Sequence, residues 1–540
     1  MYPMRRLSPT ARDRLYRCIP PLLVVSLAGL LYLGTAAPDL TWAHDGADGG
    51  DLISAVMTGG VPHPSGYPTY CLLGRLFTLL PLGSIARRMN LFSATMAAAS
   101  AWLIYLSCAR LLNCWPGQER RHTTTALLSI GAALAYACGP TLWSQATIAE
   151  VYAPSALFFA LCLYLALCIA LQQPPVSTAK GLASAGLASP MKGPGSETLW
   201  GALGLALGVG LGTHLTLALA VPGLALLVWP RRTGRRLAAL GLGGALGLGV
   251  YLYLPLAAAG GPLVSWGDAS TGSGFWWLVS GQYYHRYAFS LPLQYLPTRL
   301  GAWARLWGQQ LLWVGLVPAL VGLWSWWESG RRRWAAATLI SLALYSLYAI
   351  TYDTTDSYVY LIPSYAITAL WLAEGLRAIG AGFLGSGGAP TRGWAIIAVV
   401  LALGVPLGSV VCNYPDMNLH NDHEATDWVD ATLSELPAGA MLITGEDGQT
   451  FALDYACWVE GRCQDVVVVD GELLSQAWYL EQLARRYPEL NLSQGTTSVL
   501  QWVNAQIQQR RVFISSARPE LANDYQIITR GRLWEIVAQK

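Results

Sequence analysis

Charged residues are scarce in this chain of 540 residues, because Asp, Glu, Lys and Arg together make up only 12% of it. Soluble domains carry roughly 25% of such residues, so the scarcity excludes an ordinary soluble protein. Hydrophobic residues make up 54% of the sequence. The formal net charge of +3 gives no reason to expect binding to nucleic acid. The composition therefore predicts a polytopic membrane protein.

Several motifs for nucleotide, metal and nucleophile chemistry are also missing. The chain has no P-loop, HExxH or nucleophile elbow, and its turn Gly445-Glu446-Asp447-Gly448 is not a GxGxxG fingerprint. Its ten cysteines follow no metal-binding spacing. Cys457 and Cys463 lie close together and could pair if the C-terminal part of the chain lies outside the cytoplasm. The sequence thus predicts no nucleotide site and demands no cofactor.

Long apolar runs are abundant. A helix needs about 20 apolar residues to cross a bilayer, and about eleven segments meet or approach this length. We predict membrane helices at residues 18–37, 89–112, 124–145, 152–172, 198–213, 214–229, 237–256, 305–327, 334–351, 357–376 and 393–412. The first segment follows several arginines and could be a cleaved signal peptide. It exceeds the usual signal core of about 7–15 residues, so we expect a retained helix.

Basic residues predict the orientation of these helices, because cytoplasmic loops are enriched in Lys and Arg. With the N-terminus inside, every predicted inner loop is basic, notably at residues 231–236 and 331–333. The Pro-, Gly- and Ser-rich segments 173–197 and 380–393 are predicted to be flexible inner loops. An odd number of helices places the chain after residue 412 outside, whereas an error of one helix would move it inside. We expect an integral protein of a bacterial inner (plasma) membrane.

The chain after residue 412 has a different character. Residues 441–444, 465–470 and 512–515 are predicted to be buried strands, and residues 475–487 an amphipathic helix. Alternating strands and helices favour a small α/β domain. We therefore predict a transmembrane domain over residues 1–412 and a soluble α/β domain over residues 413–540.

The most unusual polar segment is 43–68, AHDGADGGDLISAVMTGGVPHPSGYP, which directly follows the first apolar run. Ionisable groups at a membrane edge are costly and usually functional. Asp48 and Asp51 are three residues apart, so one helical turn would place both on one face; they are the predicted catalytic pair. Asp45 is expected to be merely solvated. Asp51 could instead cap a helix, and His63 could only fix a turn.

Polar residues from the other predicted outer loops are candidates for substrate binding. Together with His63 they are Arg75, Glu150, Tyr152, His214, Trp266, Asp268, Arg286, Tyr352 and Asp353. Some have structural alternatives, such as a satisfied buried histidine for His214 and a membrane-belt residue for Trp266. Clustered carboxylates with a histidine also suit a hard cation, although no spacing here demands a metal. Several loops that converge at one membrane face predict an active site at the bilayer surface rather than a pore.

Several of these segments form a joint pattern. Its parts are Asp48-Gly-Gly-Asp51, Gly60-Val-Pro-His63-Pro-Ser-Gly66-Tyr-Pro68, Leu73-Gly74-Arg75, Ala149-Glu150-Val-Tyr152, Gly212-Thr-His214, Trp266-Gly-Asp268, Tyr352-Asp353 and Asp447-Gly-Gln-Thr450-Phe451. Over nearly the whole chain the pattern resembles the protein O-mannosyltransferase-like membrane family with the GT-C fold. That family has bacterial members and includes the eukaryotic transmembrane enzyme that mannosylates plexin-type receptors. Its first motif usually carries an Asp and a Glu, whereas the second acid here is Asp51.

The resemblance implies a GT-C-like helical membrane fold and an inverting glycosyltransferase. The donor would be a polyprenyl-phosphate sugar, with mannose as the family-based expectation, and the acceptor a hydroxyl of a protein Ser/Thr or a glycan. Inversion needs one carboxylate base, for which we favour Asp48, with Asp51 orienting it or binding sugar hydroxyls; the sequence does not decide between the two acids. Candidates that stabilise the departing phosphate are Arg286, His63, Arg75 and His214. The alternatives are a lipid-linked-sugar flippase or transporter, a surface-polysaccharide ligase, and a non-catalytic scaffold.

Overall fold

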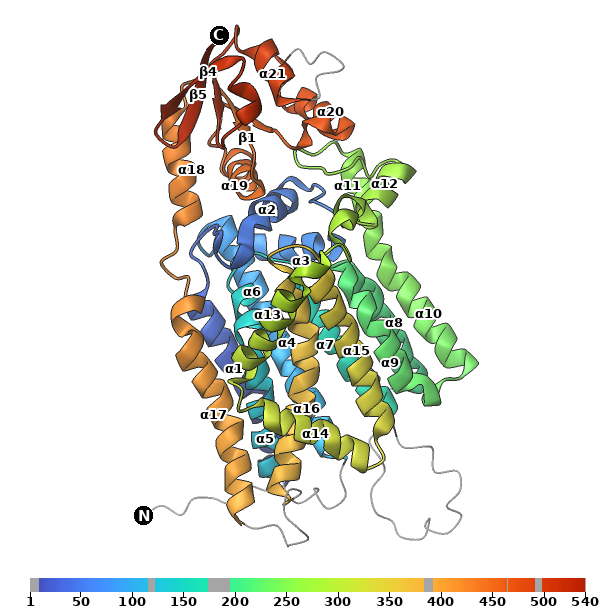
Figure 1. Cartoon of the computed structure of the whole chain (residues 1–540). Helices are drawn as coiled ribbons and strands as arrows, with labels where there is room; N and C mark the ends of the chain where they lie inside the picture. Colours follow the sequence, from blue (N-terminus) through green and yellow to red (C-terminus); the bar gives the residue numbers. More distant parts are fainter. Residues whose placement is uncertain are drawn as a thin grey trace.

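A tall helical body carries a small α/β domain at one end (Figure 1). This computed structural model describes residues 9–114, 122–172, 195–382, 392–463, 465–490 and 498–539. Most of the two predicted flexible loops, 173–197 and 380–393, lies outside the described residues. The predicted combination of apolar helices with a C-terminal α/β domain is confirmed.

Seven helices of the described chain are long and apolar enough to cross a membrane. They are α1 (Pro9–Thr35), α4 (Ile85–Leu112), α7 (Tyr152–Ala170), α10 with η5 and α11 (Gly234–Leu248, Gly249–Leu252 and Tyr253–Ala259), α15 (Arg332–Thr351), η8 with α16 (Ser357–Leu361 and Ile362–Gly380) and α17 (Arg392–Met417). The predicted domain boundary after residue 412 falls inside α17.

Two further apolar segments are bent rather than straight. Helix α5 (His122–Ala137) meets α6 (Pro140–Ala146) at 66°, and α13 (Leu296–Leu311), preceded by η7 (Leu293–Tyr295), meets α14 (Leu316–Glu328) at 95°. The first break is at Pro140, which lacks the N–H that a continuous helix would need. At the second break, Leu312 and Trp313 both have positive φ angles.

The predicted total of about eleven spans is not confirmed, because the described chain has seven, or nine if each bent pair counts as one. The predicted fifth and sixth segments are shorter apolar helices. They are α8 (Ser196–Leu211) and a segment made of η3 (Leu215–Ala220), α9 (Val221–Val228) and η4 (Trp229–Arg231). All the predicted apolar segments are therefore largely helical. By length and composition, however, not every one of them is long and apolar enough to cross a membrane.

The outer surface of the helical body is apolar. Leu242 and Leu246 of α10 are 65% and 66% exposed, and Leu407 and Val411 of α17 are 66% and 70% exposed. Helices in contact with lipid tails expose such side chains, whereas helices in water bury them. The helical body therefore has the surface of a membrane domain.

Glycines allow α8 and α10 to pack at very close range. A Cβ at Gly204 of α8 would lie 2.0 Å from the Leu240 carbonyl oxygen, and one at Gly243 of α10 would lie 2.1 Å from the Gly201 carbonyl oxygen. Small residues at such contacts let two membrane helices approach until their backbones touch. This packing fixes the helix that leads into the His214 turn.

The soluble domain contains one mixed sheet with the strand order β2-β1-β3-β5-β4. Strands β1 (Met441–Thr444), β2 (Val467–Asp470) and β3 (Val512–Ile514) are parallel, whereas β5 (Leu533–Gln539) runs antiparallel to β3 and to β4 (Tyr525–Arg530). Its helical elements are α18 (Glu424–Glu435), α19 (Asp447–Trp458), η9 (Leu473–Ser475), α20 (Ala477–Arg486), α21 (Val499–Gln506) and η10 (Pro519–Leu521). The three predicted strands and the predicted helix are all present, and Cys457 forms a disulfide with Cys463.

Short elements connect the helical body to the soluble domain. They are η1 (Ala43–Asp48), α2 (Gly49–Thr58), α3 (Pro68–Thr78), α12 (Gly272–Val279) and η6 (Gln282–Tyr287). Helix α19 lies directly over α2 (Figure 1). The contact is close, since a Cβ at Gly50 of α2 would lie 2.1 Å from the Phe451 carbonyl oxygen of α19. The candidate site described below is built around this contact.

Candidate active site

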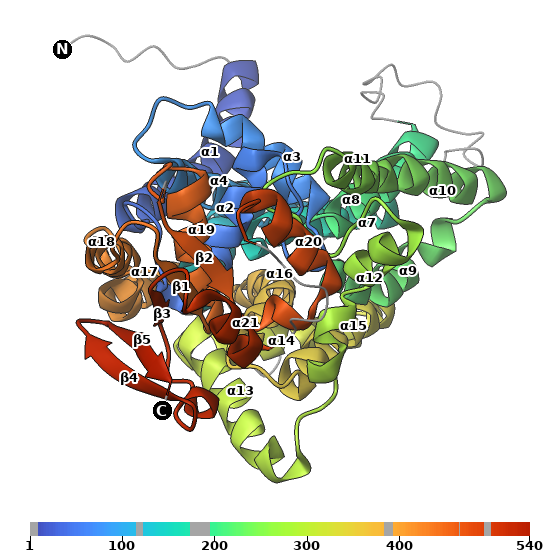
Figure 2. The ribbon, with the colours of Figure 1, turned by 90° about the horizontal axis from the view of Figure 1, so that it is seen from above.

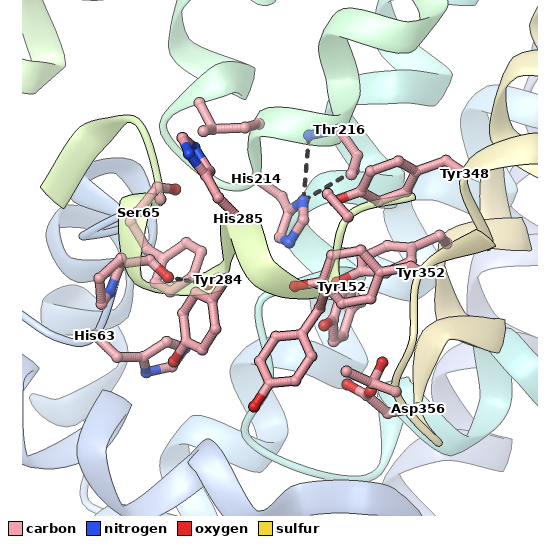
Figure 3. Close-up of a pocket in the computed structure, with 18 of the residues that line it drawn as sticks. His63, Ser65, Tyr152, His214, Thr216, Tyr284, His285, Tyr348, Tyr352 and Asp356 are labelled. Carbon is pink, nitrogen blue, oxygen red and sulfur yellow. Dashed lines mark hydrogen bonds between the residues drawn. The ribbon is translucent and has the colours of Figure 1, made fainter. Parts of the chain in front are cut away.

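A cavity of about 440 Å³ lies where the helical body meets the soluble domain. Figure 3 shows His63, Ser65 and Tyr284 on one side and Tyr348, Tyr352 and Asp356 on the other, with His214 and Tyr152 between them. The lining residues used below are Asp48, His63, Tyr67, Tyr152, His214, Tyr284, Tyr348, Tyr352, Asp356, Tyr360 and Asp447. They come from connecting loops, from membrane-helix ends and, in Asp447, from α19 of the soluble domain.

His63 bridges the two predicted catalytic aspartates. Its backbone N–H and its ring Nδ1 both lie within hydrogen-bond distance of Asp51 Oδ2, at 2.9 and 2.7 Å. Its other ring nitrogen, Nε2, lies 3.4 Å from Asp48 Oδ2. The Asp51 side chain is 1% exposed and that of Asp48 is 39% exposed. Asp48 therefore faces the cavity, while Asp51 supports the histidine from behind.

Trp266 completes the environment of Asp51. Its indole Nε1 donates a hydrogen bond to Asp51 Oδ1 at 3.0 Å. Backbone pairing holds this tryptophan in place, because Val61 donates to the Val264 carbonyl and Trp266 donates to the Val61 carbonyl, each at 3.0 Å. Asp51 thus accepts hydrogen bonds at both oxygens and acts as a buried anchor, which differs from the alternative of a simple helix cap.

The acid and the histidine have strongly shifted pKa values. Loss of hydration among the cavity walls raises the pKa of Asp48 to about 6; His63 opposes this rise, and nearby carboxylates add to it. Burial lowers the pKa of His63, but Asp48 and Asp51 outweigh burial and raise it to about 9. At neutral pH the site therefore holds a protonated His63 next to an Asp48 carboxylate of raised basicity.

Further acids surround Asp48. Asp356 and Asp447 line the cavity, and Glu150 is buried near Asp48, with 3% exposure. Burial is the largest cause of a raised pKa at each of the three. The Asp48 charge raises the pKa of Glu150 further, and the Asp51 charge raises that of Asp447. The cavity is therefore acidic, with the cationic His63 beside Asp48 and Asp51.

His214 lines the cavity as a neutral histidine. Burial lowers its pKa to about 4, and His63 adds to this effect. The backbone N–H of Thr216 donates to His214 Nδ1 at 3.2 Å, so the proton belongs on Nε2. His214 is thus oriented to donate a hydrogen bond from Nε2.

Tyrosines form much of the remaining wall. They are Tyr67, Tyr152, Tyr284, Tyr287, Tyr348, Tyr352 and Tyr360. A tyrosine offers an apolar ring face and a hydroxyl that donates or accepts. Such a wall suits a sugar ring, which presents both C–H surfaces and hydroxyl groups.

Of the twelve residues predicted from sequence, the structure brings eight to this site. Asp48, His63, Tyr152, His214 and Tyr352 line the cavity, and Asp51, Glu150 and Trp266 stand directly behind it.

The remaining four predicted residues do not line the cavity. Arg75 donates to the carbonyls of Val56 and Met57 at the end of α2. Asp268 accepts from Ser270 at the turn before α12, and Asp353 lies 4.0 Å from Arg299. Arg286 is exposed and stacks on the rings of Tyr283 and Tyr287. The contacts of these four side chains are local in this structure, although Tyr287, on which Arg286 stacks, itself lines the cavity.

Several lining residues were not assigned to the site from sequence. They are Tyr67, Tyr284, Tyr348, Tyr360 and Asp447. Asp356, which lies in the same predicted outer loop as Tyr352 and Asp353, also lines the cavity. Tyr67 lies in the same motif as His63, and Asp447 begins the motif Asp447-Gly-Gln-Thr450-Phe451. Phe451 from this motif stacks on His63 with ring centroids 6.4 Å apart. The motif was therefore a usable signal that the soluble domain reaches the site.

The part of the chain that the structure describes contains no preformed metal-binding centre. No group of three or more His, Cys, Asp or Glu side chains is arranged there to hold a metal ion. His63, the histidine nearest to the acids, directs both ring nitrogens toward Asp48 and Asp51.

Comparisons with known proteins agree with the two-part architecture. Residues 48–236 match the family described as the Protein O-mannosyl-transferase TMEM260 N-terminal domain, and residues 425–527 match TMEM260-associated domain 2. The first match begins at Asp48, and the second includes Asp447.

Curated relatives are similar over shorter stretches. The chain is 35% identical over 117 residues to the Protein O-mannosyl-transferase TMEM260 of Mus musculus, which is 22% of this chain and 15% of that protein. It is 28% identical over 148 residues to Protein O-mannosyl-transferase tmem260 of Dictyostelium discoideum, which is 27% of this chain and 16% of that protein. The chain therefore spans only a small part of the curated relatives it matches.

Solved structures show the fold. Two crystal structures of ArnT from Cupriavidus metallidurans, one bound to undecaprenyl phosphate and one in the apo state, each match with a TM-score of 0.53 over 98% of both chains. The sequence identities are 15% and 14%. The predicted GT-C-like fold is thereby confirmed, and with it the assignment as an integral membrane protein.

Proposed function

Because this chain belongs to a protein O-mannosyltransferase-like family of GT-C membrane proteins, we propose that it is an inverting glycosyltransferase. It moves a sugar, mannose by family expectation, from a polyprenyl-phosphate donor to a hydroxyl of a protein Ser/Thr or a glycan. The observation that carries this proposal is the cavity-facing Asp48 beside a His63 that is anchored by Asp51. The ArnT structure bound to undecaprenyl phosphate supports a donor of this class.

In the proposed reaction Asp48 is the general base. The acceptor oxygen attacks the anomeric carbon on the face opposite to the phosphate, and its proton passes to Asp48. The bond between the anomeric carbon and the phosphate oxygen breaks, and its electron pair leaves with the phosphate. A base with a pKa of about 6 is deprotonated at neutral pH yet still accepts a proton effectively. Asp51 is a positioning residue in this scheme.

The departing phosphate gains negative charge and needs hydrogen-bond donors. Of the four candidates from sequence, His63 and His214 line the cavity, whereas Arg75 and Arg286 do not. We assign the hydrogen-bonding role to His214 Nε2. The imidazolium of His63, whose two ring nitrogens face Asp48 and Asp51, contributes its positive charge. Tyrosine hydroxyls around them supply further donors. The scheme uses no metal, so we expect a chelator to leave the rate unchanged.

We also propose that the N-terminus is cytoplasmic and that the soluble domain and the cavity lie outside. The basic α9–α10 and α14–α15 turns lie at the end of the body opposite to the sheet, which supports this orientation (Figure 1). A disulfide in the soluble domain is typical of an oxidising compartment. The solved relative is bacterial and the curated relatives are eukaryotic, so a bacterial inner membrane stays a prediction.

The test is sugar transfer by the purified protein in lipid nanodiscs, with polyprenyl-phosphate-mannose and candidate protein or glycan acceptors. Asp48→Asn should lower the rate by about 10²–10⁴-fold, because it removes the base. Asp45→Asn is the matched control, since Asp45 is an exposed acid of the same segment that does not line the cavity. The expectation that Asp45 is merely solvated is wrong, because it accepts a hydrogen bond from Tyr358 at 3.0 Å. Undiminished transfer by Asp48→Asn would contradict the role of this residue.

The same assay separates the alternative functions. Donor turnover with a glycan acceptor alone would identify a polysaccharide ligase, whereas turnover with a protein acceptor would identify a protein glycosyltransferase. A flippase would move the lipid-linked sugar across the bilayer without cleaving it, and a scaffold would bind it unchanged. Absence of donor cleavage by folded protein with every acceptor would therefore contradict the proposed function.

A further inference from the structure

A second cavity, of about 280 Å³, lies beside α13. Its lining residues are Arg299, Ala302, Trp303, Arg305, Leu306, Gln309, Ala349, Ile350, Thr355, Ser357, Tyr358 and Leu361. They come from α13, from the end of α15 and from the segment that leads into α16. None of these lining residues is acidic, whereas the first cavity is lined by acids. Carboxylates beside the lining of the second cavity are Asp353, 4.0 Å from Arg299, and Asp45, which accepts a hydrogen bond from Tyr358 at 3.0 Å.

The two arginines are held differently. Arg299 donates to the Ser357 hydroxyl at 3.0 Å and to the Thr354 carbonyl at 2.6 Å, and it lies 4.0 Å from Asp353; its side chain is 24% exposed. Arg305 is exposed, and within the described residues it takes part in no ion pair. The cavity therefore has one fixed guanidinium and one with its donors available.

The surroundings of the cavity are those of a lipid-facing surface. Figure 2 shows α13 at the periphery of the helical body. Leu293 and Leu300, near its start, are 83% and 46% exposed, and Trp313 at its end is 60% exposed. Exposed aromatic and aliphatic side chains next to cationic ones are typical of the membrane interface.

We propose that this cavity binds the phosphate group of a membrane lipid, with Arg299, Arg305 and Gln309 as its ligands. Guanidinium groups match the geometry of phosphate oxygens and bind them through paired hydrogen bonds. Basic pockets between membrane helices bind anionic lipid headgroups in this way. The lipid chain lies along the exposed apolar side chains of α13. This proposal does not rest on the proposed function.

The occupied cavity would stabilise one wall of the first cavity. Tyr352, Thr354 and Asp356 line the acidic cavity, whereas Thr355 and Ser357 line the basic one. A single segment therefore separates the two cavities. Arg299 is the residue that holds this segment to α13, so a phosphate on Arg299 adds a further contact to the same joint.

The experiment measures which lipids the purified protein retains. The protein is delipidated in detergent and incubated separately with phosphatidylglycerol, undecaprenyl phosphate, phosphatidylcholine or inorganic phosphate, and bound molecules are counted by native mass spectrometry. Removal of one charged hydrogen-bonding partner typically costs about a factor of ten or more in affinity. Arg305→Gln should therefore reduce retention of the phosphate lipids about tenfold, and Arg305→Lys should restore part of it.

Arg235→Gln is the matched control, because Arg235 is an exposed arginine at the opposite end of the helical body. It should leave retention unchanged. Loss of both phosphatidylglycerol and undecaprenyl phosphate in Arg305→Gln identifies a general headgroup site, and loss of undecaprenyl phosphate alone identifies a site for the polyprenyl lipid. Equal retention by wild type and Arg305→Gln would overturn the proposal, as would binding of inorganic phosphate as tightly as the lipids. Sugar transfer is measured separately, so failure here leaves the proposed function intact.

Discussion

Asp51 organises the acidic wall of the cavity although it does not line it. Its two oxygens are within hydrogen-bond distance of the His63 backbone N–H, the His63 ring and the Trp266 indole. These contacts fix the imidazole so that Nε2 faces Asp48. Asp51 is one methylene shorter than the Glu that the resembling family usually has here. The shorter side chain is sufficient, because its hydrogen-bond partners approach it from the following loop and from the segment around Trp266.

Asp51→Asn should therefore destabilise the protein as well as slow transfer. The amide nitrogen cannot accept a hydrogen bond, so at least one buried donor loses its partner. The expected cost is about 2–3 kcal/mol in the free energy of unfolding. Thermal unfolding in nanodiscs measures it, with Asp48→Asn as the comparison, because the cavity-facing Asp48 should affect rate more than stability. An Asp51→Asn protein as stable as wild type would contradict the role of an anchor.

The pH dependence of transfer should be bell-shaped. Asp48 must be deprotonated to act as the base, so kcat/KM rises as pH increases through about 6. His63 must be protonated to stabilise the departing phosphate, so kcat/KM falls as pH increases through about 9. His63→Gln should lower the plateau and remove the alkaline limb. It should also move the acidic limb to higher pH, because the cation that lowers the pKa of Asp48 is gone. A pH profile unchanged in shape by His63→Gln would contradict the coupling.

For single residues, the sequence predicts site residues that belong to one short motif. It misses residues that reach the site only through tertiary packing. Asp48, Asp51 and His63 belong to one short segment, so their spacing was informative. Asp447 lies almost 400 residues further along the chain, and only the contact of α19 with α2 brings it to the cavity. Arg75 shows the converse, because a cation near a functional motif satisfies backbone carbonyls instead.

Among the secondary-structure elements, the contact between α2 and α19 is the joint between the two parts of the molecule. Gly50 makes it possible, because α2 approaches the α19 backbone more closely than a side chain allows. Trp42 strengthens the joint by donating from Nε1 to the Gly448 carbonyl at 3.0 Å. The joint positions Asp447 and Phe451 over His63.

Gly50→Ala should separate these two helices. Its Cβ would lie 2.1 Å from the Phe451 carbonyl oxygen, so the backbone must move. Such overpacking typically costs about 1–3 kcal/mol. We expect faster hydrogen exchange in α19 and a reduced transfer rate. Gly404→Ala in α17 is the control, because a Cβ there meets no atom within 4 Å. Unchanged exchange in α19 would contradict the importance of this contact.

Element positions were largely predictable from apolar length, but their geometry was not. Hydropathy measures how apolar a segment is and says nothing about the direction of the helix axis. Each bent pair, α5 with α6 and α13 with α14, was therefore predicted as one continuous helix. Pro140 was a visible breaker for the first bend. The second bend depends on positive φ angles at Leu312 and Trp313, residues that do not normally adopt them, so tertiary packing must impose it.

At the scale of the whole molecule, charge is distributed between two ends. The acidic cavity lies where the helical body meets the soluble domain, and the basic α9–α10 and α14–α15 turns lie at the far end (Figure 1). A lipid-linked donor keeps its tail in the bilayer and its phosphate at the interface. Under the proposed function, a cavity between the ends of membrane helices and a soluble domain would receive the donor from the membrane and the acceptor from the aqueous side.

This arrangement predicts a defined orientation in the membrane, which cysteine labelling can measure. Asn523→Cys in the soluble domain and Arg235→Cys at the start of α10 both replace exposed side chains, at opposite ends of the molecule. In intact cells or spheroplasts, a membrane-impermeant maleimide should label Asn523→Cys and leave Arg235→Cys unlabelled. Both should react after the membrane is permeabilised, and the parent chain gives the background from its own free cysteines. The reverse pattern would place the cavity in the cytoplasm, and a donor presented at the outer face could then not reach Asp48.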